Sequence, residues 1–289
     1  MIYEGVVYRP PSERKSLIIQ VTVGCSHNKC TYCNMYRNKK FKVKNLEDIY
    51  EDIKCAKDIY DSVERIFLGD ANALCIETEK LIMILDKIKS LFPECKGIGI
   101  YGSPRDIYNK SAQELEKLRK YGLDIIYSGI ESGSDKVLSM VNKGTSKDEI
   151  IIGGKKVIES GIKLSLIVIL GLGGKRLWED HAHETYRVLN KIQPNYLAFM
   201  TLINYLGTEL NKEIESGKFL MLEPEEILIE QKLILDNLKL ENCIVKSNHR
   251  SNYLNIGGKF PEDKEKIIKK ITGKIMDKND NIDSLLRLI

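Results

Sequence analysis

Short apolar runs alternate with amphipathic segments along the first two thirds of the chain. Six runs are predicted to be strands: 17–23, 65–68, 97–101, 124–130, 164–170 and 195–201. Five stretches between them carry apolar residues at helical spacing: 46–60, 77–91, 111–121, 146–160 and 178–192. Two of these helices open with a serine followed three residues later by a glutamate, the pattern of a capping box: Ser111 with Glu114, and Ser146 with Glu149.

Strands that alternate with helices predict parallel pairing, because each helix returns the chain to the same end of the sheet. Six units are fewer than the eight of a closed barrel, so an open doubly wound sheet and a partial barrel both fit. Residues 206–289 differ, with helices expected over 223–240 and 261–271 and a short strand over 243–245. The predicted domains are an amino-terminal extension (1–15), an α/β part (16–205) and a small mixed carboxyl-terminal extension (206–289).

The composition agrees with a folded α/β protein. With 289 residues, 43% of them hydrophobic, the chain can bury a core without disulfides, and disordered, collagen-like and disulfide-scaffold classes are excluded. The net charge of +4 indicates little about partners. Neither a signal-peptide pattern nor an apolar run near the ~18 residues of a spanning helix is present, so we expect a cytoplasmic protein with no membrane association.

Three of the seven cysteines, Cys25, Cys30 and Cys33, fall within nine positions directly after the first predicted strand. Their loop leaves the carboxyl end of a parallel strand, where α/β proteins gather ligands. Three thiols on one loop suit an iron–sulfur or zinc site, and ordinary buried thiols are the alternative. The other four are expected to be small apolar residues in helices and core: Cys55, Cys75, Cys95 and Cys243.

The fourth ligand decides which metal centre the loop carries. Two-iron clusters and structural zinc sites need four protein ligands. Cys55 is the nearest candidate in sequence, but it falls inside the helix predicted over 46–60, and His27 is too close to Cys25 for the usual zinc spacing. A four-iron cluster with three protein ligands and one open iron is the simplest solution. An iron–sulfur electron-transfer protein with Cys55 as fourth ligand is the alternative, and a zinc-stabilised binding protein is a third.

The cysteine loop, with Tyr32 just before its last cysteine, resembles the cluster-binding motif of the radical S-adenosylmethionine (radical SAM) superfamily. The commonest loop of that superfamily has three residues between the first two cysteines, whereas this loop has four. The resemblance implies a partial (β/α)6 barrel in which SAM chelates the open iron of a [4Fe-4S] cluster. It also implies an enzyme that cleaves SAM reductively to a 5′-deoxyadenosyl radical, with oxygen excluded.

Two further matches follow at the ends of the second and fourth predicted strands. Gly69-Asp70 stands where the superfamily contacts the amino group of SAM, although the usual acid there is glutamate. The segment 129–135, with Lys143 downstream, resembles the coproporphyrinogen-oxidase-like and methylthiotransferase-like branches. This similarity implies that Glu131 reaches the ribose or amino group of SAM and that Lys143 pairs with its carboxylate. The structural alternative for Asp70 and Glu131 is a helix cap or a solvated loop acid.

Three other residues complete the implied cofactor site. Gly171 opens a glycine-rich segment that resembles the adenine contact, and a tight turn is its alternative. Tyr32 is expected to pack on the adenine, with core packing as its alternative. Ser103, after the third predicted strand, is assigned to the same cofactor.

The residues that receive the radical are sought in the polar tract 246–253. If this tract folds over the barrel mouth, His249, Arg250 or Tyr253 is expected to hold a substrate or donate hydrogen, and a solvated turn is the alternative. The run 37–44 has five positive charges and no acids, which suits either an anionic substrate, including RNA, or a solvated loop. Because no RNA-binding module accompanies this run, a small-molecule substrate is favoured.

The sequence also narrows the expected reaction. We expect a one-electron donor such as flavodoxin or ferredoxin. Cys243 stands alone after residue 205, and the stretch before the first strand is too short for a cobalamin-binding domain. These features disfavour methylthiolation and cobalamin-dependent methylation, and leave decarboxylation, rearrangement, dehydrogenation and simple methyl transfer open.

Overall fold

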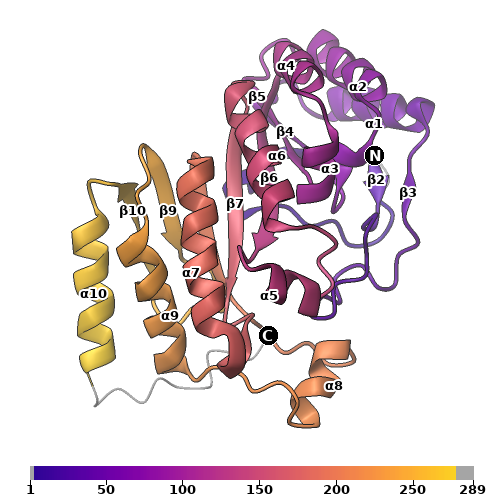
Figure 1. Ribbon diagram of the computed structural model, residues 1–289. Coiled ribbons are helices and arrows are strands. Elements are labelled where there is room, and N and C mark those ends of the chain that lie inside the picture. The colour runs from indigo at the N-terminus through magenta and orange to yellow at the C-terminus, as the bar shows by residue number, and fades with distance from the viewer. Residues whose placement is uncertain (1–2, 278–289) are drawn as a thin grey trace. The chain divides into compact units, whose positions relative to one another are not determined.

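The computed structural model describes residues 3–277, which fall into two compact units interleaved along the chain (Figure 1). The first unit comprises Met1–Asn28, Met35–Ser128 and Lys156–Leu164. The second comprises Lys29–Asn34, Gly129–Lys155 and Ser165–Ile289. The boundaries at 15 and 205 expected from the sequence remain predictions.

The first unit carries parallel strands in the order β1 (Leu17–Gln20), β4 (Arg65–Gly69), β5 (Gly97–Tyr101) and β6 (Leu123–Glu131), of which β6 runs on into the second unit. The predicted parallel pairing is confirmed here. The predicted strand 17–23 divides after Gln20, because β2 (Thr22–Val23) pairs antiparallel with β3 (Lys42–Val43) in a separate small sheet.

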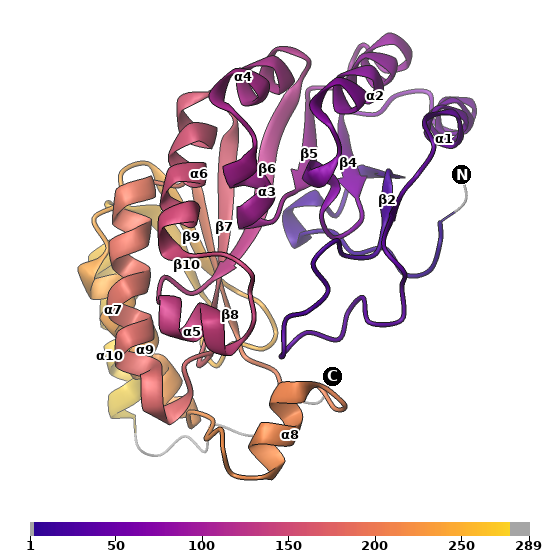
Figure 2. The same cartoon turned by 45° about the vertical axis from the view of Figure 1, so that its right-hand side comes forward.

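Three helices of the first unit follow the predicted spans closely: α1 (Leu46–Ile59), α2 (Thr78–Leu91) and α4 (Ala112–Lys120). The unit also contains α3 (Pro104–Asn109) and the short 3-10 turns η1 (Pro11–Glu13) and η2 (Ala73–Cys75). In Figures 1 and 2, α1 lies beside α2 and α2 beside α4. The predicted capping box is confirmed, since Ser111 Oγ accepts from the Glu114 N–H and the Glu114 carboxylate accepts from the Ser111 N–H at 2.8 Å.

The second unit contains the parallel strands β7 (Lys163–Leu170), β8 (Tyr196–Thr201) and β9 (Cys243–Ser247), followed by the antiparallel β10 (Ile256–Phe260). The first two residues of β7 belong to the first unit. Three long helices, α7 (Gly174–Ile192), α9 (Pro224–Asn237) and α10 (Lys264–Met276), run side by side in Figure 1. Helix α6 (Lys147–Glu159) spans both units and begins with the predicted Ser146 and Glu149 cap, the serine N–H donating to the Glu149 carboxylate at 2.9 Å.

Some elements differ from the sequence prediction. Helices α3, α5 (Asp135–Met140) and α8 (Glu209–Glu215) and strand β10 were not expected, because six or seven residues are too few to establish a period and β10 contains a Gly-Gly pair. Helix α7 begins at Gly174 instead of 178, since its first turn is polar and gives no apolar signal. Helix α10 begins at Lys264, because the Asp263 carboxylate accepts from the Lys259 N–H at 2.8 Å and shapes a turn before it.

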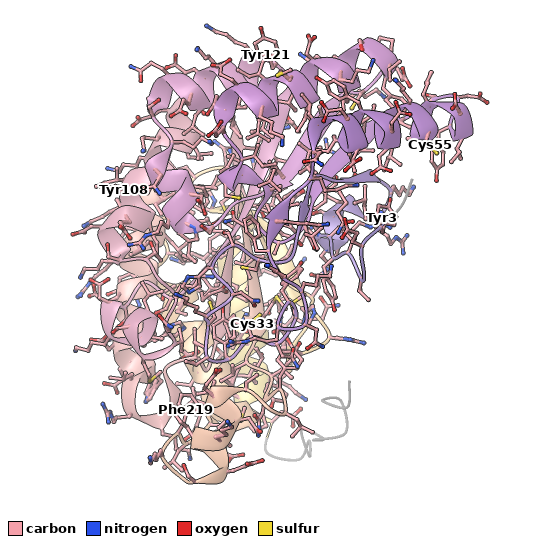
Figure 3. The ribbon with its side chains drawn as sticks, turned by 90° about the vertical axis from the view of Figure 1, so that its right-hand side faces the viewer. Tyr3, Cys33, Cys55, Tyr108, Tyr121 and Phe219 are labelled. Atoms are coloured by element: carbon pink, nitrogen blue, oxygen red, sulfur yellow. The ribbon has the colours of Figure 1, made fainter. Side chains whose placement is uncertain are left out.

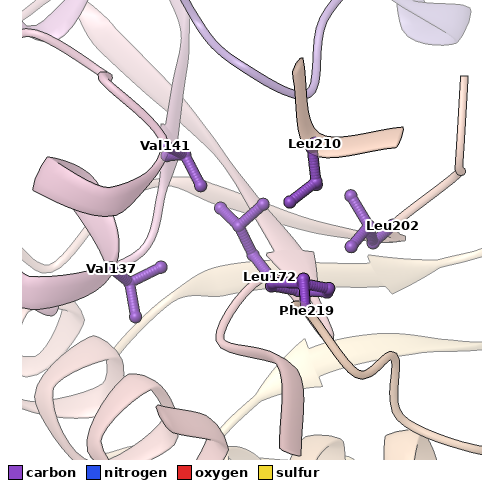
Figure 4. Close-up of a cluster of buried hydrophobic side chains, with 6 residues drawn as sticks. All are labelled: Val137, Val141, Leu172, Leu202, Leu210 and Phe219. Carbon is purple, nitrogen blue, oxygen red and sulfur yellow. The ribbon is translucent and has the colours of Figure 1, made fainter. Parts of the chain in front are cut away.

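A cluster of buried apolar side chains joins several loops of the second unit (Figure 4). Its members come from α5, from the segments after β7 and β8, and from α8 and the segment after it: Val137, Val141, Leu172, Leu202, Leu210 and Phe219. The cluster therefore packs α5 and α8 against the segments that leave the carboxyl ends of β7 and β8. Among residues 3–277, no helix has the length and apolar character needed to cross a bilayer.

Candidate cofactor site

The cysteine loop begins in the first unit, where Cys25 is anchored by backbone and side-chain hydrogen bonds. The Asn28 N–H donates to Cys25 Sγ at 3.4 Å, and the Asn28 side-chain amide donates to the Tyr36 carbonyl at 2.9 Å. Asn72, just after β4, donates to Ser26 Oγ at 2.6 Å. The residue beside Cys25 is therefore fastened to the carboxyl end of β4.

The second half of the loop belongs to the second unit. The Cys33 N–H donates to the Cys30 carbonyl at 3.2 Å, which forms a tight turn around Tyr32. Thr31 donates its N–H to the Val141 carbonyl and accepts from the Leu210 N–H, each at 3.0 Å. This part of the loop is thus held between the end of α5 and the start of α8.

The donor chemistry of the loop fits an iron–sulfur cluster. Cys25, Cys30 and Cys33 form no disulfide, and each is partly exposed. Across residues 3–277, His, Cys, Asp and Glu side chains nowhere form a preassembled group of three or more suited to a metal ion. The fit therefore rests on three soft thiol donors within one anchored loop.

Cys55, Cys75 and Cys243 lie in helices or in the core, as the sequence predicted, whereas Cys95 lies in a turn. Cys55 projects from the unbroken helix α1 (Figure 3), and Cys243 is buried in β9. Burial raises the pKa of Cys75 to about 11 and that of Cys243 to about 12, as expected for thiols that pack as small apolar groups. Cys95, before β5, is partly exposed, and burial raises its pKa as well.

Asp70 follows Gly69 at the end of β4 and is fully buried in the first unit. Its Oδ2 accepts from the Gly24 N–H at 3.2 Å and from Lys39 Nζ at 2.7 Å. Burial and then this carboxylate raise the pKa of Tyr36, whose hydroxyl hydrogen-bonds to Asp70. Oδ1 of Asp70 is buried with no hydrogen-bond partner among the described residues. The carboxylate thus keeps one acceptor atom open beside the start of the cysteine loop.

Ser103 caps the amino terminus of α3. Its Oγ accepts from the Asp106 N–H at 3.2 Å, and its own N–H donates to Asn72 Oδ1 at 2.8 Å. The Asn72 amide also donates to Asp106 at 2.6 Å. Asn72 joins the ends of β4 and β5 to the cysteine loop and was not predicted from the sequence. Its place two residues after Asp70 is the signal that could have indicated it.

Glu131 and Lys143 form an ion pair of 2.7 Å in the second unit, with side chains only 10% and 13% exposed. Glu131 has a φ of 64°, and a Cβ on Gly129 would collide with its carboxylate. The glycine is therefore required for this acid to fold back at the end of β6. The Tyr32 hydroxyl hydrogen-bonds to Glu131, and burial followed by this carboxylate raises the pKa of Tyr32 well above its ordinary value.

The ring of Tyr32 packs against the apolar cluster around Leu172. The packing alternative for this residue therefore holds in the structure, together with a polar contact to Glu131. Its expected place on the adenine remains a prediction.

Gly171 begins a tight turn after β7, with a φ of 78° and its N–H donating to Glu230 Oε2 at 2.6 Å. A Cβ at this position would meet Ile227 at 2.6 Å. The turn predicted as the structural alternative is thus present, and it rests on helix α9. Glu230 was not predicted from the sequence, because it lies 59 residues from Gly171 along the chain.

The polar tract forms the turn between β9 and β10. Ser251 Oγ accepts from the Thr201 N–H at 3.1 Å, and the Asn252 amide donates to the Phe199 carbonyl at 2.7 Å. These bonds fasten the turn to the carboxyl end of β8, the same edge from which Gly171 leaves β7.

The three residues proposed to act on the substrate lie on this turn. His249 hydrogen-bonds to Ser251 Oγ at 2.8 Å, and burial followed by neighbouring Arg250 lowers its pKa. Arg250 is exposed and Tyr253 is partly buried. Their catalytic role remains a prediction.

The basic run 37–44 is largely neutralised within the first unit. Lys39 pairs with Asp70 at 2.7 Å, Lys42 with Glu4 at 2.8 Å and Lys44 with Asp52 at 2.6 Å. Local ion pairs of this kind weaken the case for an anion-steering surface and favour a structural interpretation.

Comparison with known proteins identifies the family. A model described as the radical SAM superfamily matches residues 19–187, more than half of the chain. The chain belongs to the radical SAM superfamily. The matched region contains the cysteine loop, Asp70, Glu131, Lys143 and the Gly171 turn.

Individual relatives of this radical SAM protein are distant. A putative methylthiotransferase of Methanocaldococcus jannaschii is 25% identical over 158 residues, or 52% of this chain, and the chain spans only 34% of that relative's length. The structure of methylornithine synthase is similar with a TM-score of 0.53 and 16% identity, covering 90% of this chain and 80% of that one. The structure of coproporphyrinogen III oxidase of Escherichia coli is similar with a TM-score of 0.55 and 17% identity. The similarity covers 76% of this chain and 50% of that one. At these identities, the structures establish the fold, that of a radical SAM partial barrel.

Membership in the superfamily supplies the cofactors and the general activity. The cofactors of this radical SAM protein are a [4Fe-4S] cluster and SAM, and the chemistry typical of the superfamily is SAM-dependent radical chemistry. Enzymes of this superfamily use an electron donor and, in general, small-molecule substrates. The alternative of a non-enzymatic electron carrier is therefore not favoured.

Proposed function

We propose that the chain is a radical SAM enzyme whose Cys25, Cys30 and Cys33 hold a [4Fe-4S] cluster with one iron open to SAM. The family match over residues 19–187, with three cysteines outside any disulfide on its first loop, carries the proposal. When bound and reduced, the cluster supplies the electron that cleaves SAM to methionine and a 5′-deoxyadenosyl radical. The protein's own residues bind SAM, orient it and exclude water.

The Glu131 and Lys143 pair suits the amino-acid end of SAM. A zwitterionic ligand carries an ammonium group and a carboxylate. It can therefore replace the Glu131–Lys143 ion pair with two new pairs, its ammonium with Glu131 and its carboxylate with Lys143. Lys143 would bind the SAM carboxylate, and Glu131 the amino group or the ribose. The low exposure of both side chains strengthens such charge pairing, because solvent screens it less.

Within the first unit, Asp70 is proposed to accept a hydrogen bond from the amino group of SAM. Its Oδ2 is held by Lys39, while the buried Oδ1 can accept one further hydrogen bond. An ammonium donor is the group that such an orphaned carboxylate oxygen favours. In the second unit, the turn that Gly171 opens is proposed to contact the adenosine part, and in the first unit Ser103 remains a proposed cofactor contact. The ring of Tyr32 offers a flat apolar surface for the base.

The substrate is proposed to be a small molecule that meets the turn between β9 and β10. His249, Arg250 and Tyr253 would contact it, since the turn lies at the same strand edge as Gly171 in the second unit. The ion pairs made by Lys39, Lys42 and Lys44 give no support to an RNA substrate. A flavodoxin or ferredoxin would supply the electron.

Replacing the three loop cysteines together with alanine tests the proposal. After anaerobic reconstitution, the wild type is expected to bind about four iron atoms per chain and to release 5′-deoxyadenosine from SAM with dithionite. The triple variant is expected to lose both the iron chromophore and the product. Cys55→Ala serves as the matched control and should retain both. Iron retained by the triple variant, or lost by the control, would overturn the ligand assignment.

A further inference from the structure

Three polar side chains of the second unit are fully buried and have no part in the proposed function: Ser132, His181 and Glu230. Ser132 follows Glu131, His181 lies on α7, and Glu230 lies on α9. Helix α9 is outside the region that the family model matches. The carboxyl-terminal extension thus contributes a buried acid to the matched part of the chain.

His181 and Glu230 each make a hydrogen bond to one loop segment, and they lie close to one another. His181 Nδ1 hydrogen-bonds to Ser132 Oγ at 2.8 Å, and Glu230 Oε2 accepts from the Gly171 N–H at 2.6 Å. His181 Nε2 lies 4.0 Å from Glu230 Oε2. Neither His181 Nε2 nor Glu230 Oε1 has a hydrogen-bond partner among the described residues. Helix α7 therefore holds the Ser132 segment through His181, and helix α9 holds the Gly171 turn through Glu230.

Both loop segments belong to the proposed SAM site. Ser132 begins the segment that follows Glu131. Helix α7 makes further hydrogen bonds to this segment. Gly133 donates its N–H to Thr185 Oγ1 at 2.9 Å, and Ser134 bonds through its hydroxyl to Asp180. Gly171 opens the turn assigned to the adenosine part.

The chemistry of these groups argues against a purely space-filling role. Burial raises the pKa of Glu230 to about 8 and lowers that of His181 to about 4, so both are neutral near pH 7. Burying polar groups with unpaired atoms costs free energy that apolar side chains of similar volume would not. These residues instead provide hydrogen bonds of fixed direction. Glu230 accepts from the Gly171 N–H, and His181 bonds to the Ser132 hydroxyl.

We propose that Glu230 and His181 are positioning residues for SAM, with Glu230 fixing the Gly171 turn and His181 fixing the Ser132 segment. The inference rests on the proposed function, because it assumes that both segments contact SAM. Its geometric part concerns the protein alone, and can be measured without the cofactors.

Hydrogen–deuterium exchange of the cofactor-free protein tests the geometric part. Glu230→Leu removes the acceptor, so exchange in a peptide covering 170–174 is expected to rise about tenfold. Glu230→Gln keeps an acceptor oxygen and should exchange as the wild type does. Gln231→Leu is the matched control: it removes the neighbouring buried side chain of α9, whose amide nitrogen has no hydrogen-bond partner among the described residues. Unchanged exchange in Glu230→Leu would overturn the inference.

SAM binding to the reconstituted protein tests the functional part. Glu230→Leu is expected to raise the KM for SAM about tenfold at equal iron content, with kcat changed less than about twofold. Glu230→Gln should restore the wild-type KM. If Glu230→Leu does not fold, Ser132→Ala is the milder variant, with an expected rise of about threefold. A wild-type KM in the folded variants would refute the positioning role.

The two hypotheses fail separately in these experiments. A wild-type protein that neither binds nor cleaves SAM refutes the proposed function, whatever the exchange data show. A wild-type protein that cleaves SAM, with variants that match it in exchange and KM, refutes only the positioning role.

Discussion

Single residues of the site are held by charge and hydrogen bonds that the sequence pattern does not display. Lys39 belongs to a run that reads as a basic patch, yet it pairs with the buried Asp70. The sequence predicts Asp70 as a site residue from its place after a strand. It does not predict the role of Lys39, because Asp70 lies 31 positions away and the contact depends on the path of the loop.

Lys143→Met tests the ion pair at the residue scale. The change leaves the Glu131 carboxylate in a site where its side chain is only 10% exposed, at a cost on the order of 3 kcal/mol. We expect a lower Tm by calorimetry and SAM affinity at least about tenfold weaker by titration calorimetry. Lys136→Met is the control, since Lys136 is 69% exposed and pairs with Asp180 at the surface, where about 0–1 kcal/mol is expected. Equal effects of the two changes would refute the special role of Lys143.

Glu230 makes the stability of the protein depend on pH. Its pKa is raised from 4.5 to about 8 by burial, so the folded chain binds a proton that the unfolded chain releases above pH 4.5. Stability from this group is fully present below pH 4.5 and falls as pH rises toward 8, by up to about 1.4 kcal/mol per pH unit.

Urea unfolding of the wild type and Glu230→Gln at pH 6.5 and pH 8 measures this effect. The advantage of the wild type over the variant is expected to shrink between these values. His181, whose pKa is lowered to about 4, makes stability fall only as pH drops through 6.5 toward 4, and so does not disturb the comparison. A constant difference between the two proteins would show that Glu230 is ionised throughout.

At the scale of elements, helix spans are predictable where capping and apolar periodicity agree. The caps at Ser111 and Ser146 are both present, and α1 and α2 match their expected spans within one residue at each end. Short elements such as α5 and α8 escape prediction, because they are stabilised by the tertiary cluster around Leu172 instead of by a local pattern.

Gly133→Ala tests how closely α7 and the segment after β6 approach. A Cβ at Gly133 would collide with the backbone carbonyl of Glu184 on α7, which cannot rotate away. We expect a loss of about 1–3 kcal/mol in urea unfolding, together with weaker SAM binding. Gly273→Ala, in α10 with open space around it, is the control and should gain about 0.5–1 kcal/mol. A neutral Gly133→Ala would mean that the segment can move away from the helix.

For the whole molecule, the parallel pairing of the strands and the cofactor class follow from the sequence, whereas the contact between the Gly171 turn and helix α9 does not. Parallel β/α alternation and the cysteine spacing are local signals, and the family match agrees with both. Contacts such as Gly171 with Glu230 join residues 59 apart in different sequence contexts. No spacing rule predicts a pair of this kind.

Cofactor binding should stabilise the whole chain. A ligand that binds the folded state alone adds about 2.7 kcal/mol at one hundred times its Kd. We expect SAM to raise the Tm of the cluster-loaded wild type in a calorimetric scan under argon, and to leave the Tm of the triple cysteine variant unchanged. A shift of similar size in the triple variant would mean that SAM binds independently of the loop.

The carboxylate that α9 brings to the Gly171 turn bears on how freely this catalytic core can be exchanged among its relatives. In a chimera that joins residues 19–187 to the carboxyl-terminal portion of another member, the Gly171 N–H would lose its hydrogen-bond acceptor. It would keep one only if the other member's portion places an acceptor at the same point. Portability of the core would then be decided by a single oxygen atom outside it.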